Sequence, residues 1–140
     1  MRLLALAVLI CGCGAPGPRY LSAPDADPSL PFSHAVLTGD TLYVAGTLGI
    51  DPDTGQPPAD PADEARLALD GIAKKLALAD MTMSDLVAVQ VFCSDTELYT
   101  TFNDVYRTYF DGNYPTRAFV GSGPLLRGAR FEILGTAVRR

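Results

Sequence analysis

The stretch Tyr114–Gly135, YPTRAFVGSGPLLRGARFEILG, decides the fold of this 140-residue chain. β-Branched and aromatic residues are concentrated in Thr116–Val120 and again in Phe131–Ile133, and the segment between them is rich in glycine and contains a proline. Two short runs of this kind around a glycine-rich turn are typical of a β-hairpin. We therefore predict that the two runs form neighbouring antiparallel strands.

Two charged side chains on these predicted strands are candidates for a functional site. Side chains alternate between the two faces of a strand, so Arg117 shares a face with Phe119, and Glu132 shares a face with Leu134. The apolar neighbours indicate that both faces are buried. Because a buried charge is unfavourable when it stands alone, Arg117 and Glu132 are each expected to have a partner or a ligand.

A second predicted hairpin lies at the start of the folded region. Residues 35–38 and 41–47 are both rich in β-forming side chains, and Gly39-Asp40 separates them. A two-residue connection of this type favours a tight turn between antiparallel strands. Residues 51–60, which are dense in proline, aspartate and glycine, are predicted to form a loop.

A helix is predicted after this loop. Asp60 is suited to the N-cap, Pro61 to the first helical position, and two acidic residues follow in the first turn, where they favour the helix dipole. Apolar residues recur at helical spacing until about Ala79. They are Ala65, Leu69, Ile72 and Leu76.

A buried strand and a second helix complete the pattern. Leu86–Phe92 is short and apolar, as expected for a buried strand. Ser94 and Glu97 form a capping-box pattern for a helix that ends near Gly112. The resulting order is β-β-α-β-α-β-β. We therefore predict an α+β fold in which a single sheet is backed by two helices.

The composition limits both the number of domains and the class of partner. Hydrophobic residues make up 48% of the chain and charged residues 19%, which supports one domain with a core, predicted over residues 31–140. Acidic residues outnumber basic residues by 16 to 11. A general electrostatic attraction to nucleic acid is therefore not expected.

The three cysteines and the single histidine show no metal-binding pattern. Cys11, Cys13 and Cys93 are too few and too unevenly spread for a disulfide framework, and none lies at a metal-ligand spacing from His34. No metal is predicted. Cys93, at the end of an apolar strand, is expected to be a small buried residue.

The N-terminus has the features of an export signal. A positively charged start precedes the apolar run Leu3–Ile10, which is too short to span a bilayer. Gly12 and Cys13 follow it and resemble the bacterial lipoprotein cleavage box. We predict a lipoprotein-type signal peptide at residues 1–13, acylation of Cys13, a proline-rich tether at residues 14–30, and a membrane-anchored protein in the periplasm or on the cell surface. The alternative is a frayed extension on a cytoplasmic protein.

Seven short motifs occur in unbroken order between residue 31 and the end of the chain. They are PFSHAV at 31–36, VAGT at 44–47, IDPDTG at 50–55, FNDVY at 102–106, PTR at 115–117, RFEI at 130–133 and AVRR at 137–140. In this order they resemble the motifs of the Rid (YjgF-type) enamine/imine deaminase family. The resemblance implies a chorismate-mutase-like fold and a homotrimer with pockets between subunits.

The resemblance also implies an activity and a set of site residues. The activity is the hydrolysis of a small enamine or imine of a 2-amino acid to the 2-oxo acid and ammonia, without a cofactor. Arg117 would bind the substrate carboxylate, since a guanidinium presents a planar pair of donors that matches it. Glu132 would orient or activate the attacking water. The residues that would shape the pocket are Phe32, Ala45, Gly46, Asn103 and Phe119.

Departures from the family pattern keep other functions open. Phe32 stands where many relatives have tyrosine, Phe119 replaces a smaller residue, and Thr47 replaces glutamine. A bulkier and more apolar pocket indicates a substrate different from the smallest enamines. A non-catalytic trimeric binding module for small carboxylates is the alternative. The ribonuclease activity sometimes attached to this family is disfavoured by the acidic charge.

Overall fold

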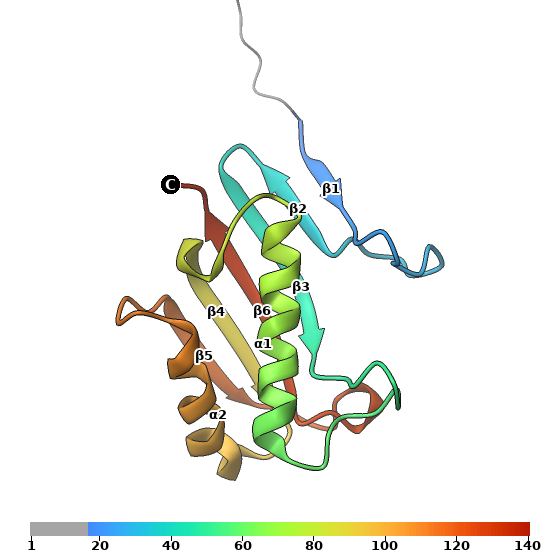
Figure 1. Cartoon of the computed structure of the whole chain (residues 1–140), viewed down its shortest axis with the longest axis vertical. Coiled ribbons are helices and arrows are strands. Elements are labelled where there is room, and N and C mark those ends of the chain that lie inside the picture. The colour runs from blue at the N-terminus through green and yellow to red at the C-terminus, as the bar shows by residue number, and fades with distance from the viewer. Residues whose placement is uncertain (1–16) are drawn as a thin grey trace, which may run out of the picture.

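The computed structural model describes residues 17–140, which form a six-stranded mixed sheet with two helices on one face (Figure 1). The strands are β1 (Arg19–Leu21), β2 (Ala35–Thr38), β3 (Thr41–Leu48), β4 (Leu86–Cys93), β5 (Thr116–Gly121) and β6 (Phe131–Val138), and their order across the sheet is β1-β2-β3-β6-β4-β5. The helices are α1 (Pro61–Ala77) and α2 (Tyr99–Tyr106). Short 3-10 turns occupy Met83–Asp85, Thr96–Leu98, Arg107–Tyr109 and Leu126–Gly128.

The predicted hairpin between β2 and β3 is confirmed. The two strands pair antiparallel, with Thr38 opposite Thr41 across the Gly39-Asp40 turn. Gly39 has a φ of +54°, a conformation that glycine adopts without steric cost. The local sequence was therefore sufficient to specify this turn.

An additional strand precedes the predicted domain. β1 pairs antiparallel with β2 at the edge of the sheet, with Tyr20 opposite Val36. The sequence analysis assigned these residues to the tether of residues 14–30. The structure differs because a three-residue strand needs only an unpaired edge to bind to, and β2 offers one. The predicted signal peptide and Cys13 lie outside the described residues.

Helix α1 begins as predicted. The side chain of Asp60 accepts a hydrogen bond of 2.8 Å from the backbone N–H of Ala62, and Pro61 is the first helical residue. The predicted apolar stripe is buried against β3 and β6. Within residues 17–140, no helix combines the length and the hydropathy that a membrane span requires.

Helix α2 is shorter than predicted and is capped differently. The predicted capping box of Ser94 and Glu97 is wrong, because the side chain of Asp95 accepts the hydrogen bond from the backbone N–H of Glu97 at 3.0 Å. A 3-10 turn precedes α2 and another follows it, so the regular helix ends at Tyr106 rather than near Gly112. The buried residues of α2 are Phe102, Val105 and Tyr106.

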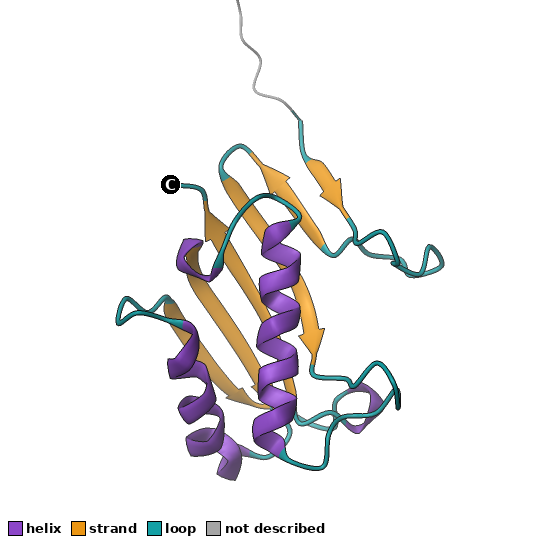
Figure 2. Ribbon diagram, in the orientation of Figure 1, coloured by secondary structure: helices purple, strands orange, loops and turns teal. Residues whose placement is uncertain are grey.

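The predicted hairpin between residues 116–120 and 131–133 is wrong. β5 pairs in parallel with β4, with Arg117 opposite Val89, and β6 lies between β3 and β4 as an antiparallel partner of both. A parallel pair needs a crossover connection, and here α2 provides it (Figure 2). β4 therefore separates β5 from β6, and Glu132 lies opposite Phe92 of β4.

The two faces of the sheet have different surroundings. Phe131 and Ile133 point into the core beneath the helices and are at most 1% exposed. Glu132 and Leu134 alternate with them and lie on the face that carries no helix. The prediction that the face of Glu132 is buried is therefore not met within a single chain. This face is only partly covered.

Candidate functional site

The predicted site residues fall into two groups on opposite faces of the sheet. Arg117 is aligned with the buried Val89 and lies on the helix face, next to α2. Glu132 is aligned with Leu48 and Phe92 on the opposite face. A single chain therefore does not bring Arg117 and Glu132 together.

Arg117 is held by one hydrogen bond and several aromatic rings. Its Nη2 donates to Oδ1 of Asn103 over 2.6 Å. Its guanidinium carbon lies 4.6 Å from the ring centroid of Tyr106. Three further rings, those of Tyr99, Phe102 and Phe119, have centroids at 5.8 to 5.9 Å. A cation placed over aromatic faces is attracted by their electron density, so the guanidinium is oriented before any ligand arrives.

A cavity of about 350 Å³ opens beside this guanidinium. Its lining residues are Tyr99, Asn103, Tyr106, Arg107, Tyr114, Pro115 and Arg117. The predicted site residues Arg117 and Asn103 are therefore neighbours in one cavity. Phe119 contacts the cavity wall through its edge-to-face packing on Tyr99, with ring centroids 5.0 Å apart.

Tyr106 is a site residue that the sequence analysis did not single out. It is 4% exposed, and its hydroxyl makes no hydrogen bond to any residue of the described region. Burial raises the pKa of Tyr106 to about 12, although the nearby Arg117 cation acts in the opposite direction. The phenol is therefore neutral and can donate a hydrogen bond. Its position within the FNDVY motif was the only available signal.

The second group contains Glu132, Gly46 and Ala45. A Cβ atom at Gly46 would overlap Oε1 of Glu132, so the carboxylate lies directly over the glycine. Lys75 of α1, which the sequence analysis did not single out, also belongs here. Its Nζ donates hydrogen bonds to the carbonyl oxygens of Ala45 and Gly46 and to Oγ1 of Thr47.

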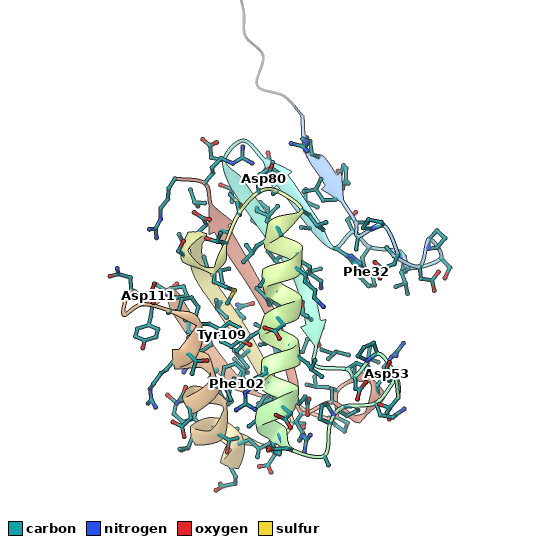
Figure 3. The ribbon with its side chains drawn as sticks, viewed as in Figure 1. Phe32, Asp53, Asp80, Phe102, Tyr109 and Asp111 are labelled. Atoms are coloured by element: carbon teal, nitrogen blue, oxygen red, sulfur yellow. The ribbon has the colours of Figure 1, made fainter. Side chains whose placement is uncertain are left out.

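Within one chain, Phe32 belongs to neither of these two groups of site residues. Figure 3 shows it in the loop that joins β1 to β2, far from Phe102 on α2. It is 54% exposed and lies near His34, with ring centroids 6.4 Å apart. His34 accepts a hydrogen bond from the backbone N–H of Ala23 at 3.1 Å. Both residues line a cavity of about 330 Å³.

A buried ion pair joins Glu64 of α1 to Arg130, the residue before β6. Glu64 is fully buried and accepts hydrogen bonds from the backbone N–H groups of Arg130 and Phe131 and from Nε of Arg130. Arg130 also donates to the carbonyl oxygens of Pro58 and Ala59. The sequence analysis assigned Glu64 to the helix dipole and missed this role, because its partners are more than sixty residues away in the chain.

Residues 17–140 contain no cluster of three or more histidine, cysteine, aspartate or glutamate residues that could hold a metal ion. Cys93 is buried, as predicted. Burial raises the pKa of the Cys93 thiol, which makes it a poor nucleophile. The candidate groups of the site are Arg117 and Asn103, beside the buried Tyr106, and Glu132 on the other face of the sheet.

Comparisons with known proteins agree with this architecture. A family model described as Endoribonuclease L-PSP matches residues 22–139. The chain is 38% identical over 109 residues to 2-iminobutanoate/2-iminopropanoate deaminase of Rattus norvegicus, covering 77% of this chain and 80% of the rat protein. It is 34% identical over 110 residues to the Homo sapiens protein of the same name, covering 78% and 80%.

Solved structures show the same fold. The YjgF gene product of Escherichia coli superposes with a TM-score of 0.79 at 28% identity, covering 87% of this chain and 99% of that one. Escherichia coli TdcF with bound serine gives a TM-score of 0.76 at 31% identity, covering 87% and 94%. With a family model, similar sequences and a common fold that each span most of the chain, this protein belongs to the Rid (YjgF-type, endoribonuclease L-PSP) family.

Proposed function

We propose that this protein is a hydrolase that converts a small enamine or imine of a 2-amino acid to the 2-oxo acid and ammonia. The observation that carries the proposal is the preorganised Arg117. Asn103 holds one of its nitrogens at 2.6 Å, and aromatic rings hold its plane, so its remaining donors are directed at one orientation of a carboxylate. The rat and human relatives are named for such a reaction on 2-iminobutanoate and 2-iminopropanoate.

The reaction needs water to add to the carbon of the C=N bond. Glu132 would accept a proton from this water as the new C–O bond forms, and the nitrogen, which takes the electron pair of the C=N bond, would receive that proton back from Glu132. When the resulting carbinolamine collapses, its hydroxyl proton moves to the nitrogen, the C–N bond breaks, and ammonia leaves as the C=O group forms. A carboxylate with a free oxygen near the reacting carbon is suited to this proton transfer.

The complete site would form between copies of the chain in a homotrimer. Arg117 and Glu132 lie on opposite faces of the sheet, so they can meet only when the open face of one chain packs near α2 and β5 of another. The open face also exposes apolar side chains, with Tyr43 53% and Val87 42% exposed. Covering them would favour association. Escherichia coli TdcF, which has this fold, was solved with bound serine, a small molecule with a carboxylate.

The substrate would be larger than the smallest imines. Phe119 packs edge-to-face against both Tyr99 and Phe102, at centroid distances of 5.0 and 5.5 Å. These rings surround the guanidinium with apolar surface. An apolar wall favours an apolar substrate side chain, since its burial is favourable.

The test is an assay of the full chain against imines generated in the cuvette by an amino acid oxidase from alanine, leucine and phenylalanine. Release of 2-oxo acid above the spontaneous rate is expected, with the largest acceleration for the apolar side chains. The matched control is Glu132→Gln at the same concentration. If all imines decay at the spontaneous rate while the protein still binds 2-oxo acids, the protein is the alternative, a binding module for small carboxylates.

We also propose that the protein is exported and acylated at Cys13. Support comes from the charged start, the apolar run Leu3–Ile10 and the Gly12-Cys13 pair. Expressed from Met1 in a bacterium, it is expected in the membrane fraction, and Cys13→Ser is expected to release it. Soluble protein that retains Met1, identified by mass spectrometry, would support the cytoplasmic alternative.

A further inference from the structure

β3 contains a β-bulge at the predicted pocket residues. Val44 pairs with Gly135 of β6, and the next pair is Thr47 with Ile133. Ala45 and Gly46 therefore stand opposite the single residue Leu134. An extra residue of this kind interrupts the regular ladder and turns its carbonyl groups away from the neighbouring strand. Those carbonyls need other partners.

Lys75 supplies the partners from helix α1. Its Nζ lies 3.1 Å from the carbonyl oxygen of Ala45, 2.9 Å from that of Gly46 and 2.8 Å from Oγ1 of Thr47. An ammonium group has three N–H donors, and all three are accounted for by these atoms. Gly71, one helical turn earlier on the same face of α1, lets the helix approach, because a Cβ there would collide with Thr47.

Glu132 lies on the other side of the same bulge. Its carboxylate covers Gly46, where no side chain could fit, and Thr47 points the opposite way, toward α1. The Lys75 ammonium and the Glu132 carboxylate thus enclose the backbone of Ala45 and Gly46 from its two sides. Burial lowers the pKa of Lys75 to about 8, and the negative charge of Glu132 opposes this shift. β3 presents only backbone and hydroxyl oxygens to the ammonium. Glu132 is the charged side chain whose electrostatic effect raises the pKa of Lys75.

We propose that Lys75 is a positioning residue for Glu132: it fixes the shape of the bulge that supports the carboxylate and provides the positive charge behind it. The proposal rests on the assignment of Glu132 to water activation. Lys75 does not touch the substrate. Loss of Lys75 is therefore expected to act through Glu132. Binding of the substrate carboxylate by Arg117, which lies on another strand, is expected to stay unchanged.

The first test is a double-mutant cycle in turnover of an imine. Lys75→Met is expected to lower kcat about 10-fold with little change in KM, within the range of coupling between contacting groups. In a Glu132→Gln background it should have no further effect on kcat, because the group that it positions is gone. Lys75→Arg keeps the charge and should retain part of the activity. Lys74→Met is the control, since Lys74 is the exposed neighbour on the same helix.

Equal falls in kcat for Lys75→Met in both backgrounds would overturn the proposal, as would wild-type turnover in the Lys75→Met protein. A fall in kcat that appears only with Glu132 present supports it. If the Lys75→Met protein does not fold, the same comparison in both backgrounds is made with Lys75→Arg.

The second test does not depend on turnover. The Lys75 ammonium is titrated by ¹⁵N nuclear magnetic resonance in the wild-type and Glu132→Gln proteins. Loss of the nearby negative charge is expected to lower the titration midpoint of Lys75, whereas a lysine that only fills space would titrate unchanged. Absence of wild-type turnover would contradict the proposed function, and this titration would still decide the coupling: a lower midpoint supports it, and an unchanged midpoint overturns it.

Discussion

Arg117 and Glu132 lie on opposite faces of the same sheet, on strands that β4 separates. Neither residue can reach the other within one chain. The arginine has its own cavity beside α2, and the glutamate lies over the bulge of β3. If the proposed reaction uses both residues, it would require two copies of the chain, and activity would then depend on assembly.

The first prediction tests this dependence by complementation. Arg117→Ala and Glu132→Gln chains, each with impaired turnover, are refolded together in equal amounts. In randomly mixed trimers, about one quarter of the sites would combine an intact Arg117 with an intact Glu132. We expect about that fraction of wild-type turnover, and light scattering should give three times the chain mass. Mixed trimers without recovered activity would contradict a site that is shared between chains.

A second prediction concerns the chemical step. Glu132→Gln keeps the size of the side chain but removes the base, so kcat should fall about 10²–10⁴-fold, the usual contribution of a positioned general base. KM should change little. Stopped-flow measurement of 2-oxo acid release gives both constants. Unchanged turnover in a protein that unfolds at a lower temperature would instead assign Glu132 a structural role.

A third prediction concerns carboxylate binding. Arg117→Lys keeps the positive charge but loses the planar pair of donors and the bond to Asn103. Because the carboxylate is charged throughout the reaction, the loss should appear mainly as a higher KM. Titration with a 2-oxo acid followed by calorimetry should show the same weakening. An unaltered affinity in this variant would mean that the ligand binds elsewhere.

A fourth prediction follows from the pKa of Lys75. Folding lowers this pKa from its ordinary value of 10.5 to about 8. Between these two pH values the unfolded chain binds a proton that the folded chain has lost, so the free energy of unfolding should rise with pH. Below pH 8 both states carry the proton and the contribution is constant. Urea unfolding at several pH values should show this rise in the wild type and a smaller one in Lys75→Met.

A fifth prediction concerns the buried ion pair. Glu64→Ala would remove the acceptor of two backbone N–H groups and leave the guanidinium of Arg130 without its carboxylate. Removing one partner of a buried pair costs about 3–5 kcal/mol. Urea denaturation should show a loss of this size. Asp63→Ala is the control, because its pair with Arg66 is exposed and should contribute little.

The fold was predictable where local chemistry specifies it. Asp60 and Pro61 start α1, and Gly39 closes the β2–β3 turn, as their residue types indicate. The pairing of β5 was not predictable in this way. Its proximity to β6 in the sequence suggested a hairpin, but β6 fills the space between β3 and β4, where its alternate residues are buried. Strand order depends on such long-range burial.

The candidate site was predictable to a similar extent. The motifs contain both Arg117 and Asn103, whose side chains are hydrogen-bonded in the structure. Lys75 and Tyr106 were missed. Lys75 bonds to atoms about thirty residues away, and two of its three acceptors are backbone carbonyls, which leave no trace in the sequence. Only a structure reveals contacts of this kind.

Strand β1 has a consequence for the placement of the protein in a cell. Because Arg19 already belongs to the sheet, only residues 14–18 would separate the fold from an acyl group on Cys13. Five residues reach about 18 Å when fully extended. If Cys13 is acylated as proposed, the β1 edge would lie within this distance of the lipid headgroups.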